Sequence, residues 1–232
     1  MNRNAEVFSY QLKKEKRRKV ASLVLFFICL YVFINLVIKF LVCPVRQKSI
    51  SMIPDVPENS LVLTIPVSKD YRRGDVVLLN PRYKKNASFM MSCLDRFVKF
   101  FTAQQISILE DPAYPSSKAH IRRIVGMPGD TIYMRDYVLY IKANDDKHFL
   151  TEFETSPKTY NVTFYVPPAD WDTELGVKGS FDEIYLGPDE YFVLADNRKS
   201  SDDSRLWGPV KKSDISAKVL LCYFPIKSFR MY

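Results

Sequence analysis

The most specific stretch of this chain is a polar block that follows a short apolar run near the C-terminus. It reads Ala195-Asp196-Asn197-Arg198-Lys199-Ser200-Ser201-Asp202-Asp203-Ser204-Arg205-Leu206-Trp207-Gly208. Taken alone, the block is consistent with a polar turn ahead of a strand. Three other stretches precede it, in this order: Ser49-Ile50-Ser51-Met52-Ile53-Pro54, Arg73-Gly74-Asp75-Val76-Val77 and Arg122-Arg123-Ile124-Val125-Gly126-Met127-Pro128-Gly129-Asp130. All four follow a single apolar segment, and their order is more informative than any one of them.

The residues around these stretches alternate between short apolar runs and turn signals. Gly, Pro and Asp separate the runs, as in Pro128-Gly129-Asp130. The runs predict strands over 61–65, 76–79, 121–125, 131–133, 137–141, 163–166, 191–194 and 219–223. The sequence therefore predicts a mostly β fold, with an antiparallel domain over residues 44–232. In the second stretch, Gly74 is expected to take a positive φ and Asp75 to cap the turn.

Residues 88–109 interrupt this pattern, because their apolar residues recur at helical spacing with polar residues between them. We predict a helical insert there. Two placements are open for it: packed on the sheet through its apolar side, or lying in a membrane interface. Residues 143–186 are polar and aromatic and contain three prolines, which predicts variable surface loops or a small β cap.

The N-terminal part predicts a membrane anchor. Residues 1–19 carry seven Lys and Arg against two Glu, and 20–43 are mainly apolar. A bilayer core requires about 20 such residues, and a basic flank predicts a cytoplasmic N-terminus with the following domain exported. We therefore expect a single-pass protein of the plasma (inner) membrane. A cleaved signal peptide, a lipoprotein signal and a buried core helix are the alternatives.

The distribution of charge and the cysteine and histidine residues argue against a nucleic-acid-binding protein and a metalloprotein. The formal charge is +8, but from residue 43 onward 26 basic residues face 24 acidic ones. The excess is thus an N-terminal flank, and we expect no nucleic-acid partner. Cys93 and Cys222 are the cysteines of the expected domain; a disulfide between them is possible, and the sequence does not establish it. His120 and His148 lack a CxxC partner, so no metal is expected.

Ser51 is the candidate nucleophile. A serine hydroxyl attacks only when a neighbouring base takes its proton. If the stretch is extended, Ser49 and Ser51 lie on one side of a strand, since side chains alternate. Ser49 could then donate a hydrogen bond to the oxyanion that develops when Ser51 attacks.

The four stretches, placed after an apolar span, resemble the type I signal peptidases, which are membrane-anchored serine proteases that trim exported proteins. The resemblance covers residues 20–81, 120–142 and 187–224. It implies that Ser51 is the nucleophile and Ser49 the oxyanion donor. It also implies that Ser201 hydrogen-bonds the catalytic lysine, that Met52 and Ile121 flank a small specificity pocket, and that the polar block has structural roles for Asn197, Asp203 and Arg205. No cofactor is implied.

One position departs from the family pattern. The general-base lysine is expected four residues before Gly126, where this chain has Arg122. Arginine is charged at all ordinary pH values and has no acceptor atom in that form. Possible substitutes are His120, two residues earlier on the same strand face, and Lys118 or Lys48. A bulge or a water would be needed to bring His120 to Ser51.

The resemblance predicts an endopeptidase that removes signal peptides from preproteins presented at the lipid bilayer. The substrate would bind as an extended strand along a sheet edge. Two alternatives remain. One is a pseudo-peptidase that binds exported segments or a partner peptidase without cutting. The other is a membrane-tethered β-rich scaffold that does not depend on Ser51, Ser201 or Asn197. The oligomeric state is not predicted.

Overall fold

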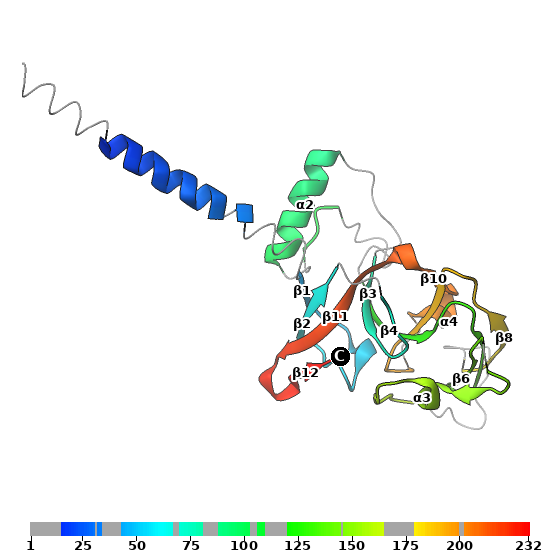
Figure 1. Ribbon diagram of the computed structural model, residues 1–232. Coiled ribbons are helices and arrows are strands. Elements are labelled where there is room, and N and C mark those ends of the chain that lie inside the picture. Colours follow the sequence, from blue (N-terminus) through cyan, green and yellow to red (C-terminus); the bar gives the residue numbers. More distant parts are fainter. Residues whose placement is uncertain are drawn as a thin grey trace, which may run out of the picture. The chain divides into compact units, whose positions relative to one another are not determined.

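The computed structural model describes residues 15–30, 32–33, 43–66, 70–80, 88–102, 106–109, 120–144, 146–164, 179–199 and 202–232. The chain divides into two units, Met1–Val42 and Cys43–Tyr232. Figure 1 gives the element labels used below. Ser201 and Lys118, both named as candidates above, lie outside the described residues.

The described part of the N-terminal unit is helical. Residues 15–30 form the helix, and its side chains are exposed. Among the described residues, no helix combines the length and the apolarity that crossing a bilayer requires. The predicted anchor at 20–43 includes residues 31 and 34–42, which lie outside the described ranges.

The second unit is built on two antiparallel sheets, which confirms the mostly β prediction. In the order of the larger sheet, its strands are β1 (Cys43–Arg46), β2 (Leu61–Ile65), β11 (Ile215–Phe224), β3 (Val76–Leu79), β4 (His120–Gly126), β9 (Glu190–Leu194) and β10 (Val210–Lys211), with β12 (Arg230–Met231) paired to β11. The smaller sheet has the order β7 (Leu150–Thr151), β6 (Val138–Lys142), β5 (Thr131–Arg135) and β8 (Phe181–Tyr185).

Short helices and turns connect these strands. They are η1 (Ile50–Met52), α2 (Phe89–Phe101), α3 (Glu152–Thr155), α4 (Ser204–Trp207), η3 (Lys212–Asp214) and η4 (Ile226–Ser228). The turn before β3 is as predicted: Gly74 has a φ of +87° and Asp75 Oδ2 accepts from the Arg72 N–H at 2.8 Å.

One predicted strand is wrong in its described part. Thr163 forms only an isolated parallel bridge with Asn197. Its N–H donates to Asp196 O and its carbonyl accepts from the Arg198 N–H, each at 2.9 Å. The segment thus pairs with the polar block and not with a sheet strand. Residues 165–166 of that prediction lie outside the described ranges.

The core covers both faces of the larger sheet. All four residues of β3 are buried. Val76 and Leu78 belong to one apolar cluster, which includes Met52, whereas Val77 and Leu79 belong to another on the opposite face. A third cluster joins Val125 and Phe192 to the side chains of the smaller sheet. Burial on both faces fixes β3 and its neighbour β4, which carries Arg122.

Gly126 marks a close approach between β4 and β9. A Cβ at this position would lie 2.7 Å from Leu186 Cδ1 and 2.8 Å from Phe192 Cβ. We expect Gly126→Ala to lower the free energy of unfolding by about 1–3 kcal/mol, because these core atoms must move. Urea unfolding measures the loss. Gly187→Ala is the matched control, because its new Cβ would meet only the Glu190 side chain, at 3.3 Å or more; equal losses in the two variants would contradict the prediction.

The helical insert is shorter than predicted and is oriented differently. The helix α2 ends at Phe101, and residues 106–109 are irregular. Asp95 accordingly accepts hydrogen bonds from the Ile108 and Leu109 N–H groups, which are not part of the helix. Phe89, Met90, Leu94 and Phe97 are exposed, so packing on the sheet through the apolar side is wrong.

The possible disulfide is not formed, because Cys222 is a free, buried thiol. Its Sγ donates to Phe224 O at 3.5 Å. Burial raises the pKa of this thiol, which keeps it protonated and unreactive.

Candidate active site

Ser51 lies in the 3₁₀ turn η1 and not in an extended strand, so the predicted geometry of this stretch is wrong. Ser49 caps the turn, and its Oγ accepts from the Ser51 N–H at 3.4 Å. The Ser49 and Ser51 hydroxyls are nevertheless in contact, with 2.7 Å between their oxygens. A capping side chain folds back over the first turn of a helix, and this brings the two serines together.

The polar block holds this turn from the other side. The Asn197 N–H donates to Ser51 O at 2.9 Å, and Asn197 Nδ2 donates to Ile50 O at 3.2 Å. Asn197 Oδ1 in turn accepts from the Lys199 N–H. Asn197 therefore positions the backbone that carries Ser51.

The Ser51 side chain is only 3% exposed, and hydrogen-bond donors surround its oxygen. Arg122 Nη1 lies 3.0 Å from Ser51 Oγ, and Gln47 Nε2 lies 3.2 Å from it. Gln47 Nε2 also donates to Ser49 O at 3.0 Å. Since a carbonyl only accepts, this contact fixes the NH₂ group of Gln47 toward the serines.

Arg122 is held in place through its other nitrogens. Its Nε and Nη2 donate to Asp202 O at 2.8 and 2.5 Å, and its Nη1 also donates to Ile121 O. Burial lowers the pKa of Arg122, while the carboxylates of Asp203, Asp202 and Asp196 act in the opposite direction. Because the ordinary arginine pKa lies far above neutrality, the group remains a cation that donates to Ser51.

The direction of these hydrogen bonds limits the chemistry of Ser51. Arg122 and Gln47 can stabilise negative charge on Ser51 Oγ, but neither nitrogen can take its proton. Within the described residues, the acceptor beside this hydroxyl is Ser49 Oγ. A neutral hydroxyl is a far weaker base than an unprotonated amine, so the site stabilises an anion better than it creates one.

His120 is positioned by Asp202 and Trp207. Its Nδ1 lies 3.3 Å from Asp202 Oδ2, and its ring centroid lies 5.8 Å from that of Trp207. Asp202 thus bridges His120 and Arg122, through its carboxylate and its backbone carbonyl. Lys48 is exposed, next to the capping Ser49.

The remaining sequence candidates form the support of the site. Asp203 Oδ2 pairs with Arg205 Nη2 at 2.7 Å and accepts from the Ala195 N–H at 3.1 Å. Met52 and Ile121 are buried in the apolar cluster that underlies the turn. Whether they also flank a specificity pocket stays a prediction.

Arg123 joins the third of the four stretches to the second and the fourth. It makes a double ion pair with Asp196, with Nε–Oδ1 at 2.7 Å and Nη2–Oδ2 at 2.6 Å. Its Nη2 also lies 2.9 Å from Asp55 Oδ2, and its Nη1 donates to Gly74 O. Burial opposes the charge, but Asp196 and Asp55 hold the pKa of Arg123 above its ordinary value.

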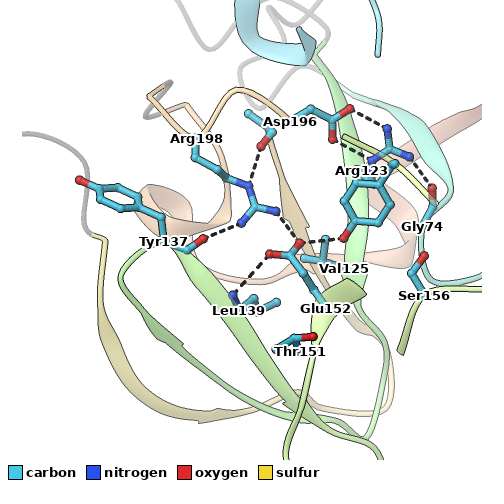
Figure 2. Close-up of polar contacts among 12 residues, drawn as sticks. Gly74, Arg123, Val125, Tyr137, Leu139, Thr151, Glu152, Ser156, Asp196 and Arg198 are labelled. Atoms are coloured by element: carbon cyan, nitrogen blue, oxygen red, sulfur yellow. Dashed lines mark hydrogen bonds and ion pairs between the residues drawn. The ribbon is translucent and has the colours of Figure 1, made fainter. Parts of the chain in front are cut away.

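A second buried ion pair, Arg198–Glu152, extends this support to the smaller sheet (Figure 2). Both side chains are fully buried. Arg198 also donates to Ala195 O at 3.0 Å and to Tyr137 O at 3.1 Å, and Glu152 accepts from the Tyr160 hydroxyl at 2.7 Å. The centroid of the Tyr160 ring lies 4.3 Å from Arg123 Cζ. Tyr160 therefore contacts one member of each buried ion pair, Arg123 and Glu152. Burial, reinforced by Glu152, raises the pKa of Tyr160 and keeps its hydroxyl a donor.

Sequence reasoning missed Gln47, Asp202 and Trp207. Gln47 reaches Ser51 only because η1 folds back after β1, and Asp202 acts on Arg122 through its backbone carbonyl. Contacts through a fold-back and through a backbone carbonyl do not depend on side-chain type, so the sequence does not predict them. The position of Trp207 inside the polar block was the one available indication, and its ring lies 5.8 Å from Arg122 Cζ.

The sequence of this chain matches a protein family and several known proteins. The family described as "Signal peptidase, peptidase S26" matches residues 19–224. Signal peptidase I P of Bacillus subtilis subsp. natto is 26% identical over 223 residues, covering 94% of this chain and 97% of the relative. Signal peptidase I U of Bacillus subtilis is 31% identical over 144 residues, covering 59% of this chain and 67% of that one. A solved signal peptidase I from Enterococcus faecalis is 20% identical, with a TM-score of 0.32 over 64% of this chain and 96% of that chain.

The family match spans most of the chain, including η1, β4 and the polar block. The chain therefore belongs to the signal peptidase family, in its type I class. Its relatives are named signal peptidase I. In this chain, Arg122 lies beside Ser51.

Proposed function

We propose that this chain binds the signal-peptide segments of exported proteins at the Ser51 site and hydrolyses them slowly or not at all. The observation that carries the proposal is the contact from Arg122 Nη1 to Ser51 Oγ at 3.0 Å. Arg122 donates hydrogen bonds and accepts none, and it occupies the position at which the family resemblance places the general-base lysine. General-base catalysis typically contributes about 10²–10⁴-fold to rate, and losing it leaves a site that still recognises its ligand.

The sheet order supports the binding half of the proposal. Among the described strands, β1 lies at the edge of the larger sheet and leads directly into Gln47 and η1. An extended peptide could add to this edge through backbone hydrogen bonds, with its carbonyl near the donors around Ser51. Arg122 and Gln47 would then donate hydrogen bonds to that carbonyl, and Ser51 would not attack it.

A membrane location is part of the same proposal. Residues 20–43 would anchor the chain in the plasma membrane with the N-terminus in the cytoplasm and the β unit exported. The apolar run and the seven basic residues before it support this. Preproteins threading the same bilayer would reach the site by diffusion in two dimensions.

A second candidate is peptidase activity through a substitute base. The 2.7 Å contact between Ser51 and Ser49 favours it, because Ser49 is exposed and could pass a proton to water. His120 is a further candidate base, through Asp202. Only the peptidase candidate requires the Ser51 hydroxyl, so binding and cleavage assays on Ser51→Ala separate the two functions.

We expect a fluorescently labelled signal peptide to bind the wild type and Ser51→Ala equally well, measured by anisotropy in detergent. Cleavage of a preprotein, followed by gel, should be slow or undetectable for the wild type and no faster for Ser51→Ala. Rapid cleavage by the wild type that Ser51→Ala abolishes would establish the peptidase instead. His120→Ala then tests the base: lost cleavage with retained binding would assign the proton transfer to His120.

A further inference from the structure

The helix α2 exposes its apolar side. Phe89 is 84% exposed and Met90 is 79% exposed, and Leu94 and Phe97 are exposed one and two turns further on. Residues at these spacings share one face of a helix. Ile106, just beyond the helix, is also exposed. A surface helix normally turns such a face toward the core, so α2 is oriented the opposite way.

The polar side of α2 binds the segment that follows the helix. Asp95 is only 4% exposed and accepts from Ser107 Oγ and from the Ile108 N–H, each at 2.7 Å. Lys99 Nζ lies 2.7 Å from Asp95 Oδ2. Burial opposes the ionised form, but these partners together lower the pKa of Asp95. The carboxylate therefore ties the polar side of α2 to residues 107–109 and leaves the apolar side of the helix exposed.

The sequence that leads into and forms α2 is basic. Between residues 82 and 99 the sequence contains Arg82, Lys84, Lys85, Arg96 and Lys99 against the single acidic residue Asp95. An apolar helical face within a basic stretch of sequence is typical of helices that lie in the headgroup region of anionic membranes. A second copy of this chain would bring the same positive charge to the interface and would be repelled.

We propose that α2 is an interfacial helix, with Phe89, Met90, Leu94 and Phe97 inserted among the acyl chains of an anionic membrane surface. The excess of basic residues in this part of the sequence favours an anionic surface over a neutral one. This contact is separate from any predicted span, because it uses the β unit itself. It is also independent of hydrolysis at Ser51, so it stands or falls separately from the proposed function.

The test uses the full chain carrying Met90→Trp, reconstituted in vesicles of phosphatidylcholine and phosphatidylglycerol. One preparation has phosphatidylcholine brominated on its acyl chains, which quenches tryptophan within a few ångströms. Glu183→Trp is the matched control, because Glu183 is exposed on β8. The emission that each variant adds to that of the parent chain is compared between the two preparations.

Insertion to a depth of about 5–10 Å should quench about half or more of the signal from M90W and little of that from E183W. Adding Lys84→Glu and Lys85→Glu should weaken the quenching, and removing phosphatidylglycerol should do the same. Equal quenching of M90W and E183W would overturn the proposal. So would an M90W signal that responds only to added signal peptide or to protein concentration, because the occupant would then be a peptide or a second copy.

Discussion

Arg122→Lys is expected to increase preprotein cleavage by about 10²–10⁴-fold over the wild type, the usual contribution of a general base. Lysine is one atom shorter than arginine, so its nitrogen would lie near the present guanidinium carbon, close to Ser51 Oγ. Burial lowers the pKa of Arg122, and the charge of Arg205 acts in the same direction. The same two effects should favour the neutral amine of a lysine, which can accept the Ser51 proton.

The pH dependence of this variant follows from the same argument. The neutral amine is the active form, so cleavage should rise as the pH rises through the lysine pKa. Asp203, Asp202 and Asp196 favour the charged form, so they shift this rise toward higher pH. Cleavage of a preprotein by the purified variant in detergent, measured across pH, gives the profile directly.

Two matched variants control the gain. R122K with Ser51→Ala should be inactive, because the amine then has no hydroxyl to activate. Arg122→Met removes the guanidinium without supplying a base, and it should not gain activity. If R122M and R122K gained equally, the effect would come from removing the cation, and the argument about the missing proton acceptor would fail. A wild type already as fast as R122K would have the same consequence.

Much of the fold is visible in the sequence because it depends on local patterns. Runs such as 61–65 and 191–194 are apolar, short and bounded by turn residues, and they are strands β2 and β9. The strand β8 was missed because its sequence, Phe-Asp-Glu-Ile-Tyr, places two acidic residues in its centre. Its register with β5, which no local pattern specifies, makes it a strand.

The candidate site likewise has features that the sequence predicts and features that it does not. The sequence shows directly that Arg122 stands four residues before Gly126. It follows from the chemistry of arginine that this side chain only donates hydrogen bonds. The 3₁₀ turn at Ser51 is not readable, because it depends on Asn197 binding the carbonyls of Ile50 and Ser51 from 146–147 residues away. The burial of Asp95 is likewise not readable from the helical pattern, because its partners lie at 107–109, after the helix has ended.

Arg198→Met is expected to lower the free energy of unfolding by about 3–5 kcal/mol, the typical cost of leaving one partner of a buried ion pair uncompensated. Glu152 would remain fully buried opposite a methionine. Urea unfolding of the full chain in detergent measures the loss. Arg135→Met is the matched control: Arg135 pairs with Asp182 at 3.8 Å on the surface, and such a pair contributes about 0–1 kcal/mol.

The double variant Arg198→Met with Glu152→Gln separates charge from packing. A glutamine keeps an acceptor for the Tyr160 hydroxyl, which lies 2.7 Å from the Glu152 carboxylate, but buries no charge. The double variant should therefore be more stable than R198M alone, with a coupling of about 0.5–3 kcal/mol. Additive losses would instead mean that Arg198 acts through its bonds to Ala195 O and Tyr137 O.

These two bonds tie the polar block to the smaller sheet, and the block carries Asn197. R198M should therefore also weaken peptide binding at Ser51, whereas R135M should not.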